Sequence, residues 1–320
     1  MKKVVTVGGG TGHYSILRGL KNYDLDLTAV VSVVDNGGST GELRTDFGIL
    51  APGDIRNCLV ALSDETELRD LARLFEYRFP LKSKRLGNHN VGNIILAALT
   101  DLCGDMAAAV KVVSKILRIR GRVLPVSLDS VELYGRTRAG RVLEGQLEVS
   151  YPERKDHIDE LWLKPAAEVY ADCADALRSA DLLVICPGDL YGSVLPSFLT
   201  RGVREALHSS RARIAYVCNL VTKQGTYGFK TSDFARELTR YCGRRPDFVI
   251  YNTKRPSRVV VDKYRKEASY FVEPDLPVLR TLCGRALGAN LLLEYDSGDK
   301  RIVRHDSERT ARMIIDLLRG

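Results

Sequence analysis

The chain has 320 residues, of which 45% are hydrophobic, so it is long enough to bury a full core. No stretch approaches eighteen consecutive apolar residues, so the sequence predicts no membrane span. The formal net charge of +8 suits a polyanionic partner. Because the basic clusters lack interleaved aromatic residues for base stacking, nucleic acid is the minor interpretation.

Seven cysteines are scattered along the chain without the spacing of zinc or C-x-x-C redox sites, and their odd number argues against a disulfide framework. The N-terminus enters an apolar run within the first few residues, which leaves no room for a signal peptide. We therefore expect a cytoplasmic protein with reduced thiols and no membrane insertion.

The first predicted elements are a strand, a glycine cluster and a helix. Val4–Val7 is typical of a buried parallel strand, and Tyr14–Lys21 has the apolar spacing of a helix. The loop between them reads Gly8, Gly9, Gly10, Thr11, Gly12. Such a loop presents backbone N–H groups and a helix N-terminus to a phosphate. His13 replaces the third glycine of a dinucleotide fingerprint and no P-loop lysine follows, so a simple strand–helix turn stays open as the alternative.

A second buried strand, Leu27–Val34, leads into Asp35. The spacing from Gly12 to Asp35 is close to that between a phosphate loop and a ribose-binding acid. Asp54 follows Pro52-Gly53 and is predicted to be the N-cap of a helix that runs to Leu62. Further helices are predicted over residues 68–79, 90–102 and 106–117.

The second half of the chain returns to a strand–helix alternation after a β-rich excursion over residues 121–164. Strands are predicted at 181–186, 212–218 and 248–251, and helices at 166–178, 194–208 and 232–241, before a last strand and helix over 301–318. This order predicts one α/β domain over residues 1–320. Its fold is Rossmann-like and doubly wound, with a mostly parallel sheet and an inserted β-rich sublobe.

Polar loops follow five of these strands. Ligands of open α/β sheets bind beyond the carboxyl ends of the strands, so these loops predict one shared site. The loops are GGGTG, DNGGSTG, PGDLYGS, NLVTKQG and NTK, which begin at residues 8, 35, 187, 219 and 252.

Two carboxylates and two arginines in this region have alternative interpretations. Asp35 suits a ribose or sugar hydroxyl, and either Asp35 or Asp54 suits a Mg²⁺ ion that bridges phosphates. The structural alternatives are an Asx-turn and a plain helix cap. Arg44 and Arg56 suit phosphate oxygens or, equally, surface ion pairs.

The sequence predicts no catalytic set. The five histidines are too dispersed for a motif, although His13 follows the glycine loop and Arg304 and His305 precede the last helix. No Ser/His/Asp order or H-E-x-x-H motif is evident. Cys58 and Cys103 lie on apolar helix faces that favour packing over nucleophilic chemistry.

Taken together, the ordered motifs resemble the gluconeogenesis factor family, which is YvcK-like and binds uridine diphosphate (UDP)-N-acetylglucosamine. That family is homologous to the 2-phospho-L-lactate transferase. The resemblance spans almost the whole chain. The motifs that carry it are GGGTG, VVDNGGSTGELR, PGDIRNCLVALS, LFEYRF, HNVGNIILAAL, RGRVLPV, ADLLVICPGDLYGSVLP, CNLVT and VRHD.

The resemblance implies a Rossmann-like fold that holds a nucleotide diphosphate derivative at the strand ends. In the bacterial branch the ligand is UDP-N-acetylglucosamine and the role is regulatory, linking carbon metabolism to cell-wall synthesis and cell shape. The alternative is a Mg²⁺-dependent transferase that uses a guanosine diphosphate-linked donor. The implied binding residues are Gly8, Gly9, Gly10, Thr11, Gly12, Asp35, Gly37, Gly38, Ser39, Asp54, Arg56, Asn57, Asn93, Gly188, Tyr191, Ser193, Asn219, Thr222, Tyr264 and Arg304.

Two positions depart from the family pattern. Asn36 stands where a second acid is common, which removes a metal ligand, and Asp189 stands where a small residue is usual. A carboxylate beside a diphosphate is unfavourable without a metal. A homo-oligomer and regulatory protein partners are compatible with the sequence, which predicts no certain cofactor.

Overall fold

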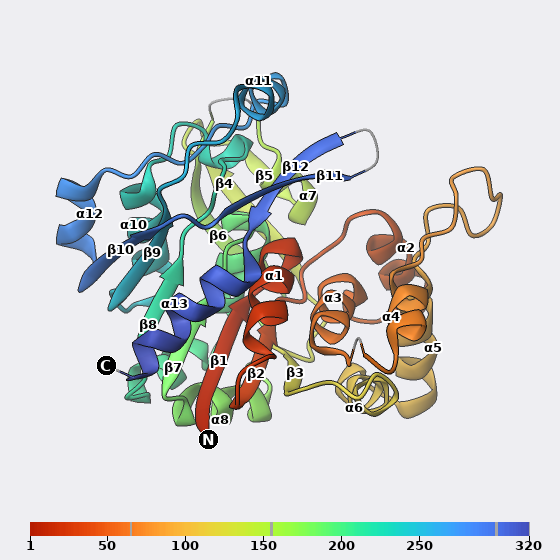
Figure 1. The fold of residues 1–320 in the computed structure, drawn as a ribbon. Helices are drawn as coiled ribbons and strands as arrows, with labels where there is room; N and C mark the ends of the chain where they lie inside the picture. Colours follow the sequence, from red (N-terminus) through yellow and green to blue (C-terminus); the bar gives the residue numbers. More distant parts are fainter. Residues whose placement is uncertain (65, 154–155, 298–299, 320) are drawn as a thin grey trace.

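The computed structural model describes residues 1–64, 66–153, 156–297 and 300–319, and its centre is a seven-stranded parallel sheet (Figure 1). The strand order is β10-β9-β8-β7-β1-β2-β3, so the chain builds one half outward from β1 and the other half outward from β7. This arrangement confirms the doubly wound α/β fold. The strands are β1 (Lys2–Gly8), β2 (Leu25–Val31), β3 (Arg122–Pro125), β7 (Leu182–Ile185), β8 (Arg213–Val217), β9 (Phe248–Asn252) and β10 (Arg285–Ala289).

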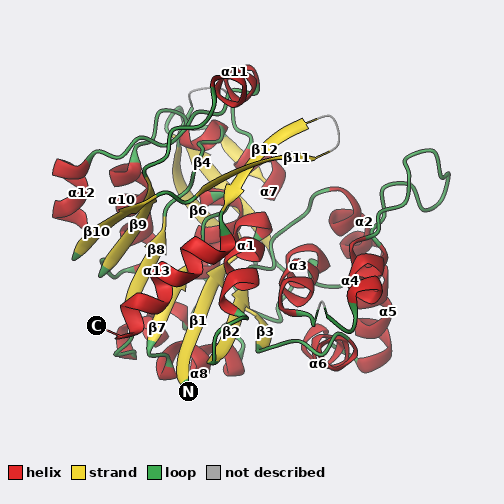
Figure 2. Cartoon of the chain, in the orientation of Figure 1, coloured by secondary structure: helices red, strands yellow, loops and turns green. Residues whose placement is uncertain are grey.

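Helices cover the sheet (Figure 2), which explains why β7 and residues 4–8 of β1 are buried at its centre. α1 (Gly10–Leu20) packs against the last helix, α13 (Ser307–Arg319), across one face. Their contact is close at Gly19, where an added Cβ would lie 2.1 Å from the carbonyl oxygen of Ser307. The structure contains no helix, among the residues it describes, that is long and apolar enough to cross a membrane.

A group of helices lies beyond β3, at the right of Figure 1. One correction arises there, because α3 begins at Pro52 and Ala51 is its N-cap. Asp54 is thus the third residue of the helix and not its N-cap, since proline suits the first turn of a helix. The sequence also did not predict α2. The helices are α2 (Gly38–Phe47), α3 (Pro52–Leu62), α4 (Arg69–Glu76), α5 (Val91–Cys103) and α6 (Met106–Ile116).

The β-rich excursion forms a separate antiparallel sheet in the order β5-β4-β6. Its strands are β4 (Glu132–Thr137), β5 (Val142–Glu144) and β6 (Ile158–Lys164), and α7 (Gln146–Ser150) lies between β5 and β6. β3 pairs with β2 in the main sheet, so the small sheet begins at Glu132 and not at residue 121.

The remaining segments follow the predicted rhythm in part. The helix predicted over residues 166–178 begins only at Ala171, and the sequence did not predict β10, β11 (Leu292–Ser297), α11 (Arg258–Lys266) or α12 (Leu276–Leu282). The helix predicted over residues 194–208 is wrong, because that stretch contains the end of a π-helical turn, a short 3-10 helix and then α9. Gly202, with φ +88°, separates the last two. The other elements are η1 (Leu190–Val194), η2 (Leu195–Leu199), η3 (Gln224–Thr226), α8 (Ala171–Ser179), α9 (Val203–Ser209), α10 (Thr231–Cys242), α11 (Arg258–Lys266), α12 (Leu276–Leu282) and the antiparallel pair β11 (Leu292–Ser297) and β12 (Lys300–His305).

Candidate functional site

The loop after β1 and the loop after β7 are in contact at the point between these two strands where the strand order reverses. An added Cβ at Gly12 would lie 1.9 Å from the carbonyl oxygen of Pro187, and one at Gly188 would lie 3.1 Å from the carbonyl oxygen of Gly9. An added Cβ at Gly9 would lie 3.3 Å from Cβ of Ser193. Contacts between the loops thus require these glycines, at the point of an open α/β sheet where ligands bind.

Gly10 differs from its neighbours, because an added Cβ there would meet no atom within 4 Å. Its φ of +67° is a conformation that only glycine adopts readily. Gly10 is also the first residue of α1, whose N-cap, Gly9, provides no side-chain cap. The first-turn N–H groups of a helix have no partner within the helix, so this open space adjoins hydrogen-bond donors and the positive end of the helix dipole.

Asp54 brings a carboxylate to the same helix end. It accepts a hydrogen bond from the backbone N–H of Gly10, and an added Cβ at Gly9 would lie 2.4 Å from its Oδ2. Burial raises the pKa of Asp54 to about 6, and the neighbouring charge of Asp35 adds to the rise. The Asp35 carboxylate accepts from the backbone N–H of Gly37 at 3.0 Å, which is the Asx-turn that the sequence allowed.

Arg56 lines a cavity of about 300 Å³, which Asp35 and Asp54 also border. It donates from Nη1 to Oδ1 of Asn93 at 3.0 Å and from Nη2 to Oδ1 of Asn57 at 2.5 Å, while its buried Nε has no partner among the described residues. Burial, and then the charge of Arg78, lower the pKa of Arg56 to about 10. The cavity therefore pairs two carboxylates with a buried guanidinium.

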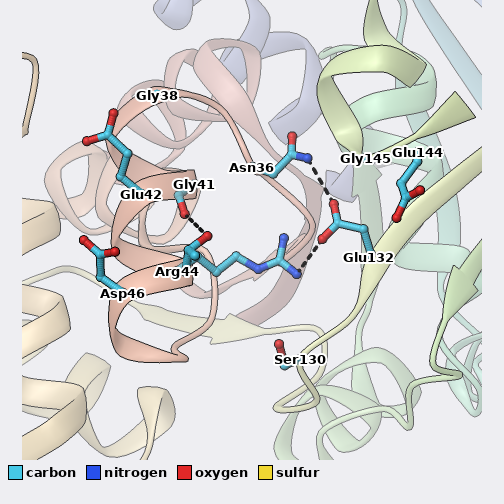
Figure 3. A pocket seen from close by; sticks show the side chains of 11 residues that line it. Asn36, Gly38, Gly41, Glu42, Arg44, Asp46, Ser130, Glu132, Glu144 and Gly145 are labelled. Atoms are coloured by element: carbon cyan, nitrogen blue, oxygen red, sulfur yellow. Dashed lines mark hydrogen bonds and ion pairs between the residues drawn. The ribbon is translucent and has the colours of Figure 1, made fainter.

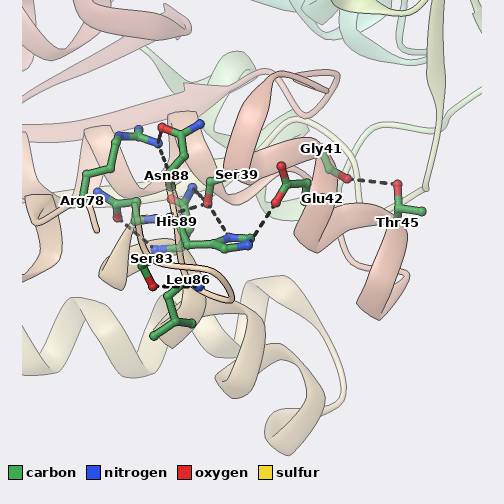
Figure 4. Close-up of polar contacts among 11 residues, drawn as sticks. Ser39, Gly41, Glu42, Thr45, Arg78, Ser83, Leu86, Asn88 and His89 are labelled. Atoms are coloured by element: carbon green, nitrogen blue, oxygen red, sulfur yellow. Dashed lines mark hydrogen bonds and ion pairs between the residues drawn. The ribbon is translucent and has the colours of Figure 1, made fainter. Parts of the chain in front are cut away.

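The N-terminus of α2 is held by a histidine network (Figure 4). The Ser39 hydroxyl lies 3.2 Å from Nδ1 of His89, and Nε2 of His89 lies 3.0 Å from Oε2 of Glu42. Oγ of Ser39 also accepts from Nδ2 of Asn93 at 3.4 Å. His89 was not among the predicted binding residues, because the chain separates it from Ser39 by fifty positions.

His13 does not face the open side of the loop. Its Nε2 lies 2.7 Å from Oγ1 of Thr6 and its Nδ1 lies 3.6 Å from Sγ of Cys58, both inside the core. Burial lowers the pKa of His13 to about 4, so the ring is neutral at physiological pH. In the structure His13 therefore supports the glycine loop from the core side.

The predicted binding residues that follow β7 and β8 lie on the other side of the point between β1 and β7 where the strand order reverses. Asn219 donates from Nδ2 to the carbonyl oxygen of Gly188 and so joins these two loops. Tyr191 is buried and donates to Oε2 of Glu237 at 3.3 Å, and Thr222 accepts the backbone N–H of Tyr270 at 3.0 Å. Tyr191 and Thr222 thus have structural partners inside this half of the molecule.

The negative charge of Asp189 is balanced by a neighbouring lysine. Its Oδ2 accepts from Nζ of Lys223 at 2.9 Å, and its Oδ1 accepts from the backbone N–H of Gly192 at 3.1 Å. The Asp189 side chain is 7% exposed. The carboxylate that departs from the family pattern therefore caps the first turn of η1 and forms an ion pair with the lysine of the next loop.

Tyr264 belongs to a small second core built on α11 and the β11–β12 pair, and Arg304 follows Val303, another member of that core. The Tyr264 hydroxyl accepts from the backbone N–H of Val303 at 3.1 Å, and Nη1 of Arg304 donates to the carbonyl oxygen of Val303 at 2.9 Å. Neither residue lines the cavity beside Asp54. His305 is buried, with its Nε2 3.1 Å from the carbonyl oxygen of Cys218.

Arg44 and Asn36 turn away from the Asp54 cavity toward the small sheet (Figure 3). Nη2 of Arg44 lies 3.1 Å from Oε2 of Glu132, and Nδ2 of Asn36 donates to Oε1 of the same carboxylate at 3.0 Å. Asn36 also accepts from the backbone N–H of Leu147 at 3.1 Å. In this structure Arg44 thus forms an ion pair with Glu132.

The sequence matches the family of the 2-phospho-L-lactate transferase CofD over residues 4–292. It is 41% identical over 316 residues to a putative gluconeogenesis factor of Thermotoga maritima, covering 98% of both chains. It is 37% identical over 320 residues to the gluconeogenesis factor of Bacillus subtilis, covering 99% of this chain and 98% of the relative. A crystal structure of a Bacillus halodurans protein superposes with a TM-score of 0.91 at 37% identity, covering 98% of this chain and 99% of the other.

Proposed function

Because the chain belongs to the CofD family and to its gluconeogenesis factor branch, we propose that it binds a nucleotide sugar, UDP-N-acetylglucosamine. In this proposal the protein is a cytoplasmic regulator that links carbon metabolism to cell-wall synthesis and cell shape. The ligand's diphosphate lies at the N-terminus of α1, where Gly10 leaves the backbone open.

The observation that carries the proposal is the open approach to Gly10 at the reversal of strand order. A diphosphate carries negative charge and many acceptor oxygens, which match the N–H groups and the positive dipole end of a helix N-terminus. The buried guanidinium of Arg56 and its unpartnered Nε supply further donors at the neighbouring cavity. Tyr264 on α11 and Arg304 on β12 would also contact the ligand.

A second candidate function, a Mg²⁺-dependent phospholactate-type transferase, is favoured by the pair Asp35 and Asp54. Their mutual repulsion contributes to the raised pKa of Asp54, and a divalent cation between carboxylate oxygens would relieve it. The described residues contain no cluster of three or more metal-ligating side chains, so a cation here would use these two carboxylates, backbone or substrate oxygens and water.

Isothermal titration separates the two functions. Purified protein is titrated with UDP-N-acetylglucosamine and with guanosine diphosphate, each with and without Mg²⁺. The nucleotide-sugar proposal predicts micromolar binding of the UDP-sugar that is indifferent to Mg²⁺. A preference for guanosine diphosphate together with a Mg²⁺ requirement would contradict the nucleotide-sugar proposal and support the transferase function.

A matched glycine pair tests the place of binding. Gly10 and Gly48 have φ of +67° and +64°, and an added Cβ meets nothing within 4 Å at either. Gly10→Ala and Gly48→Ala should therefore cost similar stability, about 1–2 kcal/mol each. Only Gly10→Ala should weaken binding of the UDP-sugar, because the added methyl group occupies the approach to the loop. Equal affinities in both variants would show that the glycine loop is only a turn.

A further inference from the structure

A second cavity, of about 730 Å³, lies between α2 and the small sheet (Figure 3). Its lining is acidic although the whole chain is basic, with four carboxylates and a single guanidinium. The charged side chains are Glu42, Asp46, Glu132, Glu144 and Arg44. A phosphate or carboxylate ligand would be repelled by this excess of negative charge.

Arg44 has one nitrogen without a partner at this cavity. Its side chain is 10% exposed, and its Nη2 is fixed by Glu132 and by the carbonyl oxygen of Val131. Nη1 is buried and has no hydrogen-bond partner among the described residues. A buried charged donor without an acceptor is costly, so an acceptor supplied by a ligand would stabilise this arrangement.

Most of the carboxylates already have partners. Glu42 pairs with His89, Glu132 pairs with Arg44, and Glu144 accepts from the hydroxyl of Tyr134 at 2.6 Å. The groups without partners in the described part of the chain are the exposed carboxylate of Asp46 and the hydroxyl of Ser130. The cavity therefore offers a fixed donor at Arg44, an acceptor at Asp46 and, at Ser130, a hydroxyl that does both.

A neutral ligand with several hydroxyl groups matches this set, because each hydroxyl both donates and accepts. The volume also lies in the range of small-molecule sites. The cavity adjoins the one beside Asp54, since Gly38 lines both and the consecutive residues Asp35 and Asn36 line one each. A ligand that has a phosphate part and a sugar part can thus occupy both.

We propose that this acidic cavity binds the sugar of a nucleotide sugar and that Nη1 of Arg44 donates to a sugar oxygen. The inference rests on the proposed function, and it adds a sugar subsite formed by α2, the segment before β4 and the end of β5. Selectivity for the sugar would then arise at α2 and the segment before β4, whereas the diphosphate is held at the glycine loop.

The test compares the dissociation constants of UDP and UDP-N-acetylglucosamine by titration calorimetry. The wild-type protein should bind the UDP-sugar about tenfold or more tightly than UDP, as expected for hydrogen bonds that involve a charged group. Arg44→Lys keeps the charge but removes the planar donor pair, and it should lower this ratio to about twofold or less while UDP affinity stays the same. The matched control is Arg213→Lys, which alters a part-buried arginine that donates to the carbonyl oxygen of Leu317.

Each outcome is decisive. A wild-type ratio near one, or a ratio that Arg44→Lys leaves intact, overturns the sugar subsite while the nucleotide proposal stands. No binding of either compound to the wild-type protein overturns the proposed function and the subsite with it. If Arg44→Lys does not fold, Ser130→Ala and Asp46→Asn decide, because both side chains are exposed. These variants should each lower the ratio by about threefold or more, and an unchanged ratio in both contradicts the subsite.

Discussion

Replacing Asp54 by asparagine should stabilise the protein above pH 6. Burial and the charge of Asp35 raise the pKa of Asp54 from 3.8 to about 6 in the folded state. The folded protein therefore holds this proton more tightly than the unfolded chain, and stability is lost as the pH rises from 3.8 through 6. A shift of about two units corresponds to about 3 kcal/mol, which is the expected gain of Asp54→Asn at pH 7.

The assay is urea denaturation of both proteins between pH 4 and pH 8. The difference in free energy of unfolding should grow between pH 4 and pH 6 and stay constant above pH 7. The amide side chain of the Asp54→Asn variant would retain an oxygen for the backbone N–H of Gly10, so the helix end keeps its acceptor. As a control, Asp70→Asn changes a side chain that is 95% exposed, and it should change the free energy of unfolding little. A less stable Asp54→Asn at pH 7, or a difference without pH dependence, would refute this reasoning.

Three further variants test contacts at and around the site. Gly12→Ala should lower the free energy of unfolding by about 3 kcal/mol in urea denaturation, because its Cβ would overlap the carbonyl oxygen of Pro187, and wild-type stability would contradict that packing. Lys223→Met should cost about 1–3 kcal/mol by leaving Asp189 buried without its ion pair, and adding Asp189→Asn should restore most of the loss. Arg304→Ala should fold normally and weaken UDP-sugar binding by about 1.5–3 kcal/mol by calorimetry, and an unchanged affinity would remove it from the site.

The strands and the polar loops could be predicted because their signals are local. Val4–Val7 is apolar and β-branched, and the glycines that follow it mark a turn whatever the rest of the chain does. The parallel order then places the ends of β1, β2, β7, β8 and β9 at one edge. Which glycine of the first loop borders open space was not predictable, since an added Cβ at Gly12 would overlap Pro187 whereas one at Gly10 would meet no atom within 4 Å.

The other features of the site could not be predicted, because they depend on contacts between residues that are far apart in the sequence. Arg44 was assigned equally to phosphate or to an ion pair, and its partner Glu132 lies 88 positions further along the chain. His89 and Ser39 are likewise joined only by the tertiary fold. α2 has a weak apolar pattern, with three buried residues in ten, which is why its periodicity did not predict a helix.

The candidate site depends on both halves of the chain. Gly10, Asp54 and Arg56 come from the half built on β1 and β2, whereas Gly188 and Asn219 come from the half that begins at β7. The two halves are joined by the pairing of β1 with β7, and at the carboxyl ends of these strands their glycine loops make close contacts that leave no room for a side chain. A diphosphate bound between them would contact both and stabilise the folded protein by mass action, by about 2.7 kcal/mol at a hundred times its dissociation constant.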